Sequence, residues 1–145
     1  MPVVPSQDLL TLGRQVLASQ PFSVLLGAEL VAFSEGRVEI RVPIRPEHKQ
    51  QHGFVHGGIM AYAADNALTF AGGSALGPAV VTSDFKINYL RPANGESIVA
   101  RASVVHAGAS QAVCRCEVYA SGPGGENLCA TSLGTIARLD TSRSA

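Results

Sequence analysis

One carboxylate in this 145-residue sequence has an unusual neighbourhood. Asp65 is the only acidic residue between Glu47 and Asp84, and it lies in the apolar run GGIMAYAADNALTFA, which we expect to form a helix. A buried charge without a partner costs several kcal/mol. Either Asn66, Thr69 or a residue of a partner chain therefore satisfies Asp65, or its carboxylate works as a nucleophile or general base in a dry cleft.

The loop before that helix carries a second chemical feature. It reads HGFVHGG and ends in His56, Gly57 and Gly58. The first N–H groups of a helix lack carbonyl partners within the helix, so they attract negative charge. Glycines also let a ligand oxygen approach the main chain closely, as an oxyanion hole requires. The same residues would also suit a loop that merely leads into a helix, with His56 capping or packing.

The spacing of these groups constrains how they act together. Asp65 lies eight residues after Gly57, which is about 12 Å along a helix axis. Two groups that act on one carbonyl must lie within about 3 to 3.5 Å of it. They therefore cannot serve one carbonyl within a single chain. Two antiparallel copies of the helix, meeting across a two-fold axis, would bring Gly57 of one chain to Asp65 of the other.

Elsewhere the sequence predicts the frame that positions these groups. Apolar residues recur at helical spacing between Ser6 and Gln20, and the run from Gly57 to Ala71 is apolar nearly all round. A helix without a polar face must be covered on most sides, and a strongly curved antiparallel sheet is the available cover. We therefore expect one α+β domain over residues 1–145, with a short N-terminal helix and one long central helix. About six strands wrap around that helix, over residues 28–33, 37–44, 79–89, 97–105, 112–119 and 128–139.

The composition excludes several classes of protein. Apolar residues make up 46% of the chain, and its 11 basic and 11 acidic residues cancel, which argues against disorder and against nucleic-acid binding. Only 15% of the residues are charged, compared with about 25% in typical soluble domains, so we expect subunits that associate. The three cysteines lack metal-ligand spacing, which predicts reduced, packed thiols. With no uninterrupted apolar leader and no membrane-length apolar run, we expect a cytoplasmic protein.

Taken together, the motifs resemble a known family. HGFVHGGIMAYAADNA, followed by VVTSDFKINYLRPA, resembles the hotdog-fold acyl-CoA thioesterases of the phenylacetate-degradation (PaaI-like) type. The resemblance covers residues 21–139, and the combination of H-G-G, an acid seven residues after the second glycine and a strand ending in N-Y-L-R-P-A is specific to the family. It implies a hotdog fold, hydrolysis of a coenzyme A thioester without metal or cofactor, and either a homodimer or a tetramer built as a dimer of dimers.

The resemblance also implies roles for single residues. Asp65 matches the family's catalytic acid, and the Gly57 N–H matches its oxyanion donor, with Gly58 beside it for substrate binding. His56 matches a His that orients the thioester or supports the loop. Gln50 stands six residues before His56, where relatives often carry an Asn that contacts the nucleophilic water or the carbonyl.

Other positions are implied to hold the carboxylate or the substrate. Thr82 matches a Ser or Thr on the third strand that positions water or the carboxylate, and Ser83 takes its place if the register is shifted by one. The phosphates of coenzyme A need cations, and several lie near strand ends and turns. Arg91, in the R-P-A turn, is the first choice, followed by Lys86, His106 and Arg101.

The sequence leaves the mechanism and the acyl group open. A thiolate leaving group needs little acid help because thiols have a pKa near about 8.5, so one carboxylate and an oxyanion hole suffice. Asp65 either attacks the carbonyl to form a mixed anhydride or deprotonates a water held by Gln50 and Thr82. The alternatives are a catalytically silent acyl-CoA-binding protein and a hotdog hydratase or dehydratase, although Phe70, not His, follows Asp65 by five residues. Four residues suit either an acyl pocket or plain core: Phe54, Met60, Tyr62 and Phe70.

Overall fold

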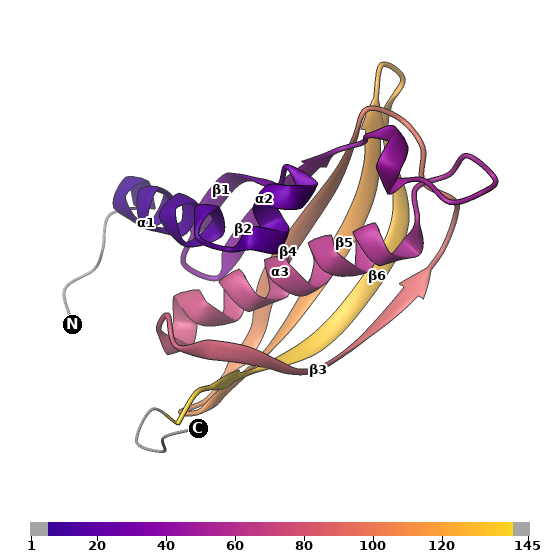
Figure 1. Ribbon diagram of the computed structural model, residues 1–145. Coiled ribbons are helices and arrows are strands. Elements are labelled where there is room, and N and C mark those ends of the chain that lie inside the picture. The colour runs from indigo at the N-terminus through magenta and orange to yellow at the C-terminus, as the bar shows by residue number, and fades with distance from the viewer. Residues whose placement is uncertain (1–5, 141–145) are drawn as a thin grey trace.

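A single long helix lies in the concave face of a six-stranded antiparallel sheet (Figure 1). The computed structural model describes residues 6–140. The helix is α3 (Gly57–Leu76), and the strand order is β1-β2-β4-β5-β6-β3. The expected α+β fold, with six strands around one central helix, is confirmed. The strands are β1 (Glu29–Ser34), β2 (Arg37–Pro43), β3 (Val80–Tyr89), β4 (Ser97–Ala107), β5 (Gln111–Gly122) and β6 (Gly125–Arg138).

Close packing against β6 explains the length of α3. A Cβ added to Gly72 would lie 2.5 Å from Cβ of Ile136, so the helix backbone rests directly on the strand. The sequence predicts an end near Ala71, but the helix continues to Leu76. Burial against the sheet outweighs the low helix propensity of Gly72 and Gly73. Although α3 is apolar nearly all round, no helix within residues 6–140 combines the length and apolarity needed to cross a membrane.

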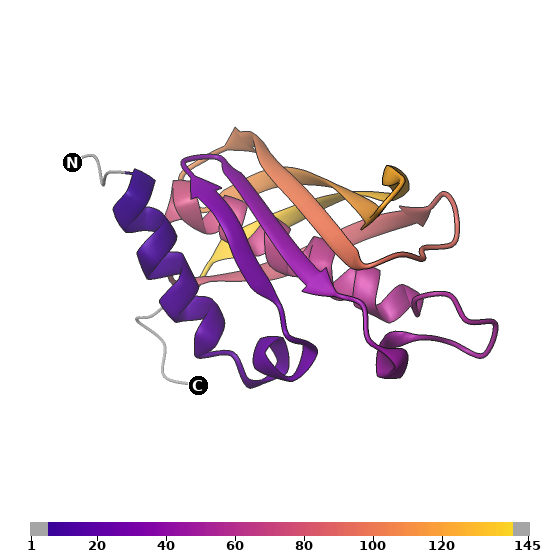
Figure 2. The same cartoon turned by 90° about the horizontal axis from the view of Figure 1, so that it is seen from above.

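The two edges of the sheet differ in what lies beside them. At one edge, β1 pairs with β2 in the expected hairpin and is covered by α1 (Ser6–Ala18), which runs alongside it (Figure 2). At the other edge, β3 pairs only with β6, so its outer side has no partner strand within the described chain. Such an edge offers unpaired backbone N–H and C=O groups to a second molecule.

A second short helix, α2 (Pro21–Leu26), was not predicted from the sequence. It starts with Pro at its first turn and ends at Gly27, whose φ of 72° is left-handed. Its Ser23 is 1% exposed and binds α3 through side chains. The hydroxyl of Tyr62 donates to Ser23, and the amide of Asn66 donates to the Tyr62 oxygen at 3.0 Å. This network fixes α2 against the middle of α3.

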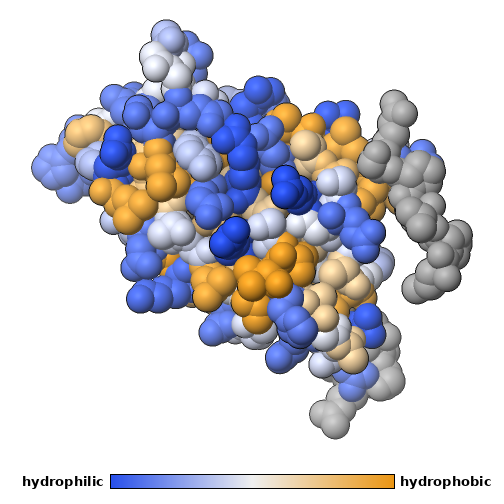
Figure 3. All heavy atoms as spheres, turned by 180° about the vertical axis from the view of Figure 1, so that it is seen from behind, coloured by the Kyte–Doolittle hydropathy of each residue, from blue (hydrophilic) through white to orange (hydrophobic). Residues whose placement is uncertain are grey.

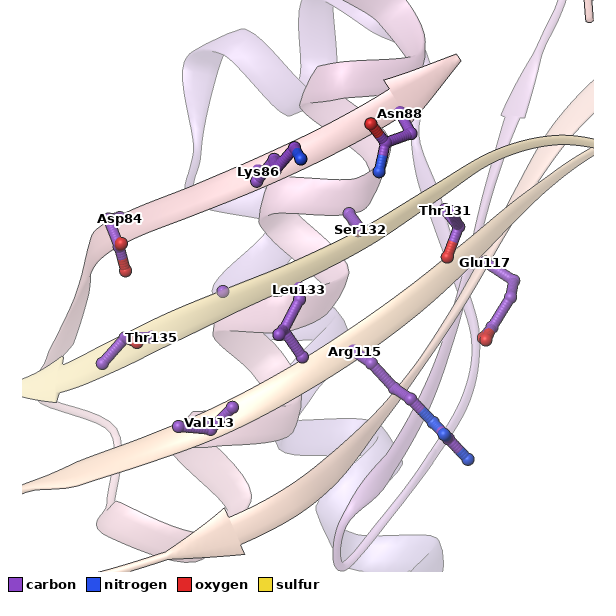
Figure 4. A pocket seen from close by; sticks show the side chains of 11 residues that line it. Asp84, Lys86, Asn88, Val113, Arg115, Glu117, Thr131, Ser132, Leu133 and Thr135 are labelled. Carbon is purple, nitrogen blue, oxygen red and sulfur yellow. The ribbon is translucent and has the colours of Figure 1, made fainter. Parts of the chain in front are cut away.

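The outer face of the sheet, opposite α3, is partly apolar. Figure 3 shows an apolar patch across this face among hydrophilic side chains. A shallow groove of about 640 Å³ lies there between β3, β5 and β6. Leu133, which is 53% exposed, lies in it among charged side chains from Asp84, Lys86, Arg115 and Glu117 (Figure 4).

All three cysteines are free thiols in the core, as expected. Cys114, Cys116 and Cys129 are fully buried. Burial raises the pKa of the Cys114 thiol to about 11 and that of Cys116 to about 12, and it raises the pKa of Cys129 as well. Because the thiolate is the reactive form, these cysteines are inert packing residues.

Candidate active site

The carboxylate of Asp65 is held by a hydroxyl from β3. Thr82 Oγ1 donates to Asp65 Oδ1 at 2.6 Å, and both residues are half-buried. Thr69 Oγ1 lies 2.9 Å from Thr82 Oγ1 and 2.8 Å from the Asp65 carbonyl oxygen, so its single proton serves one of these contacts at a time. Asn66 turns instead to the α2 network. Asp65 is therefore fixed between helix and edge strand, with a contact to Thr82 and none to Ser83.

The first turn of α3 leaves one backbone amide uncommitted. His56 is the N-cap residue, and its Nδ1 accepts the Gly58 N–H at 2.8 Å. The Ile59 N–H donates to the His56 carbonyl at 2.9 Å. Within the described residues, the Gly57 N–H has no acceptor. Of the two glycine amides, only Gly57 is thus free to bind a ligand oxygen.

An open groove of about 540 Å³ lies over this turn. Gln50, His56 and Gly57 line it from one side, and Tyr89 and Arg91 line it from the end of β3. The Tyr89 hydroxyl donates to the Gly57 carbonyl at 2.9 Å. Asp65 does not line the groove, and its eight-residue separation from Gly57 on one continuous helix corresponds to about 12 Å.

The loop that carries Gln50 is built on a buried histidine. Gln50 Oε1 accepts the His52 N–H, which closes a tight turn, and the His56 N–H donates to the His48 carbonyl at 2.8 Å. The His48 ring is 3% exposed and lies 3.2 Å from both the backbone N and Nε of Arg45. Burial, followed by the charge of Arg45, lowers the pKa of His48. The ring is therefore neutral at pH 7, and it packs in the interior under the loop that carries Gln50.

Comparison with known proteins identifies the family. The sequence profile of the Thioesterase superfamily matches residues 52–126, about half of the chain, which include the loop from His52 onward, α3 and β3 to β5. The chain belongs to the thioesterase superfamily. A crystal structure of a thioesterase family protein from Silicibacter pomeroyi is 36% identical, with a TM-score of 0.84 over 93% of this chain and 98% of that one.

Two further relatives agree with the PaaI-like assignment. A variant of the phenylacetic acid degradation protein PaaI from Thermus thermophilus is 30% identical, with a TM-score of 0.74 over 83% of this chain and 100% of that one. Human acyl-coenzyme A thioesterase 13 is 32% identical over 106 residues, which are 71% of this chain and 76% of that protein. The chain spans 62% of the length of a curated relative from Haemophilus influenzae and 66% of one from Halobacterium salinarum. The resemblance to PaaI-like hotdog thioesterases is confirmed.

The cations that the sequence suggested for coenzyme A are dispersed over the molecule. Arg91 lines the groove beside Gly57. Lys86 lies on the outer face of the sheet, on the side away from α3 (Figure 4). His106 is exposed near the end of β4 and does not line the groove. Arg101 pairs with Glu39 and Glu126 and lies over the ring of Tyr119.

Large side chains beside α3 separate into core and groove. Phe70 is buried and packs edge-on against Phe33, with ring centroids 5.4 Å apart, so it belongs to the core. Phe54 and Met60 line the groove. Tyr62 lies under α2 and contacts Phe22 edge-on at 5.4 Å. Within the described residues, no cluster of three His, Cys, Asp or Glu side chains is suited to a metal ion.

Sequence reasoning missed two residues that shape this site, Tyr89 and His48. Tyr89 stands in the N-Y-L-R-P-A motif, but its contact with Gly57 joins positions 32 residues apart. His48 stands alone among polar residues, and nothing in its spacing indicates burial. Only Tyr89 could have been identified from the sequence, because it is an aromatic residue at the end of a predicted strand.

Proposed function

We propose that this protein is an acyl-CoA thioesterase that hydrolyses a thioester of coenzyme A to the free acid and the thiol. One observation carries the proposal: Asp65, on an otherwise apolar helix, is held by Thr82, while Gly57 keeps a free N–H at the start of the same helix. A carboxylate and an oxyanion donor are the two groups that thioester hydrolysis needs. The acyl-coenzyme A thioesterase named among the relatives supports the substrate class.

In the proposed reaction, the Gly57 N–H binds the thioester oxygen as negative charge develops on it. Asp65 then either attacks the carbonyl carbon or takes a proton from the water that attacks it. The carbon–sulfur bond breaks, and coenzyme A leaves as the thiolate. On the first route the acyl group is left on Asp65 as a mixed anhydride, which water then hydrolyses to release the free acid and restore the carboxylate. Neither route requires a metal or a further cofactor, because the leaving group is already stable at neutral pH.

We further propose that each site is shared between two chains. The separation of about 12 Å between Asp65 and Gly57 along α3 supports this proposal, because two groups this far apart do not reach one carbonyl from a single chain. The unpaired outer side of β3, beside Asp65 and Thr82, supports a two-fold contact at this edge. Exposed apolar residues continue along it, with Val81 at 45% and Leu90 at 53%. Pairing of such dimers into tetramers and a cytoplasmic location remain part of this proposal.

The activity is tested by incubating the purified protein with aryl-, short-chain and long-chain acyl-CoA and measuring free thiol. Asp65→Asn preserves the volume of the side chain but removes the basic oxygen, so we expect kcat to fall by roughly two orders of magnitude or more with the fold intact. Binding of acyl-CoA without hydrolysis by the wild type would favour a silent binding protein. An Asn variant with a wild-type rate would make Asp65 structural.

The shared site is tested by mixing two inactive variants. Gly57→Pro removes the N–H, and proline suits the first position of a helix, although its ring must displace Tyr89, which lies 3.2 Å from where a Cβ would be. A heterodimer of Asp65→Asn and Gly57→Pro chains contains one site with both lesions and one intact site. We expect about half of the wild-type activity per heterodimer if the sites are independent.

Two differently tagged chains allow the heterodimer to be isolated and counted. A wild-type/Gly57→Pro heterodimer is the control, and it must show that the proline chain does not inactivate its neighbour. Heterodimers of the two lesions that are no more active than their parents would contradict a shared site.

A further inference from the structure

Tyr89 holds the residue on which the proposed oxyanion site depends. Its hydroxyl donates to the Gly57 carbonyl at 2.9 Å. Its ring lies against the same glycine, since a Cβ added to Gly57 would lie 3.2 Å from Cζ and Oη and 3.3 Å from Cε1. Tyr89 therefore fixes Gly57 in two ways, by a hydrogen bond and by close contact.

The backbone of Tyr89 is anchored in the core of the sheet. Tyr89 is the last residue of β3 and pairs with Ala130 of β6. The next residue, Leu90, donates its N–H to the carbonyl of the fully buried Cys129 at 2.7 Å. The phenol thus connects the first turn of α3 to a rigid part of the molecule.

The first turn of α3 needs such an anchor. Its N–H groups lack carbonyl partners within the helix, and two successive glycines have the greatest backbone freedom. His56 fixes Gly58 from the loop side through the Gly58 N–H. Tyr89 fixes Gly57 from the strand side through the carbonyl, which leaves the Gly57 N–H available.

Desolvation does not explain this hydrogen bond. Tyr89 is 51% exposed, so its hydroxyl could form a hydrogen bond with water in place of the Gly57 carbonyl. We infer that Tyr89 is a positioning residue that sets the place of the Gly57 N–H for the transition state. This inference rests on the proposed function, because it takes Gly57 as the oxyanion donor.

Tyr89→Phe tests the inference by removing only the hydroxyl. A displaced oxyanion donor weakens transition-state binding more than substrate binding, so we expect kcat to fall about tenfold and KM to change by less than about twofold. The melting temperature should stay at the wild-type value, since the bond is exposed to solvent. Tyr119→Phe is the matched control, because Tyr119 lies on β5 beneath Arg101, outside the groove.

A double-mutant cycle with Gly57→Ala provides a second readout. The alanine keeps the N–H but pushes the Tyr89 ring away by a few tenths of an ångström, which we expect to weaken the hydrogen bond. Adding Tyr89→Phe to Gly57→Ala should then lower kcat by less than Tyr89→Phe alone lowers it in the wild type. Additive losses would show that the two residues act separately and would overturn the inference.

The outcomes separate this inference from the proposed function. If the wild type hydrolyses acyl-CoA and Tyr89→Phe has the wild-type kcat, the positioning role fails while the proposed function stands. A lower melting temperature with unchanged kcat would make Tyr89 structural only and would also overturn it. A wild type that hydrolyses no acyl-CoA would overturn the proposed function and this role with it.

Discussion

Asp65, the proposed catalytic carboxylate, receives little support from neighbouring side chains. Its Oδ1 accepts one hydrogen bond, from Thr82, and no ion pair reaches it within the described residues. A carboxylate with several donors or a paired Arg would be stabilised in its charged form and become a weaker base. The half-buried position of Asp65, on the side of α3 next to the free edge of β3, leaves room for a substrate or a partner chain.

The hydroxyl that holds Asp65 gives a prediction for a single residue. Thr82→Val keeps the shape of the side chain but removes the donor, so the carboxylate becomes free to rotate. We expect kcat for acyl-CoA hydrolysis to fall about tenfold, the equivalent of one hydrogen bond to a charged group. Ser83→Ala is the comparison, since Ser83 is exposed and lies at the register shift between Thr82 and Asp84. A larger loss of kcat for Ser83→Ala than for Thr82→Val would show that Ser83, and not Thr82, provides the hydroxyl that holds Asp65.

For single residues, the sequence identifies the candidate functional side chains better than it predicts which other side chains contact them. The isolation of Asp65 among apolar residues makes it conspicuous without a structure. The Thr82 contact follows from the resemblance, yet the choice over Ser83 depends on a β-bulge that periodicity cannot locate. Tyr89 and Gly57 meet only because β3 ends beside the start of α3. Contacts between distant segments of this kind require the folded chain.

Among the elements, α3 contains two neighbouring glycines, Gly72 and Gly73, whose surroundings differ. At Gly72 a Cβ would lie 2.5 to 2.7 Å from three atoms of Ile136, so the residue is required by close packing. At Gly73 a Cβ would meet only Val80 Cγ2 at 3.5 Å, an ordinary contact. The neighbouring glycines therefore provide a matched pair.

The pair gives opposite expectations for stability. Gly72→Ala forces α3 away from β6, and we expect the free energy of unfolding to fall by about 1 to 3 kcal/mol. Gly73→Ala should raise it by about 0.5 to 1 kcal/mol, because alanine loses less backbone entropy in a helix. Urea denaturation of both variants measures the difference. Equal changes in the two variants would contradict the packing of α3 on β6.

The elements that periodicity describes well are those with one buried face. In β2, Val38, Ile40 and Val42 are buried, as the alternation predicts, while Arg41 is exposed. The helix α2 shows no comparable pattern, because six residues are too few to establish a helical period. Its Pro21 and Gly27 were nevertheless usable signals, since proline begins and glycine ends many helices. Tertiary contacts with Tyr62 then hold a helix that is too short to be stable alone.

For the whole molecule, the buried ionisable groups define a pH range of greatest stability. On the acid side, the pKa of His48 is lowered from 6.5 by burial and by Arg45. Below pH 6.5 the unfolded chain binds a proton at this site that the folded chain resists, so stability falls as the pH falls. The same ring supports the loop that leads to Gly57, and the functional loop should therefore be the first region affected.

On the alkaline side the sign is reversed, because the groups are buried thiols. Burial raises the pKa of Cys114 to about 11 and that of Cys116 to about 12 from 9.0. Above pH 9.0 the unfolded chain releases thiol protons that the folded chain retains, so stability again falls as the pH rises. The raised pKa of Tyr62, caused by burial, adds to this loss above pH 10.0.

We therefore expect the free energy of unfolding, measured with urea in the presence of a reductant, to be level between about pH 6.5 and pH 9 and to decline on both sides. His48→Gln separates the two limbs, because the amide keeps an acceptor for Arg45 but does not titrate. The variant should lose the decline that begins below pH 6.5 and keep the alkaline decline unchanged. The same acid decline in both proteins would place its origin outside His48, whereas a selective loss would tie the acid stability of the molecule to the histidine that packs under the loop leading to Gly57.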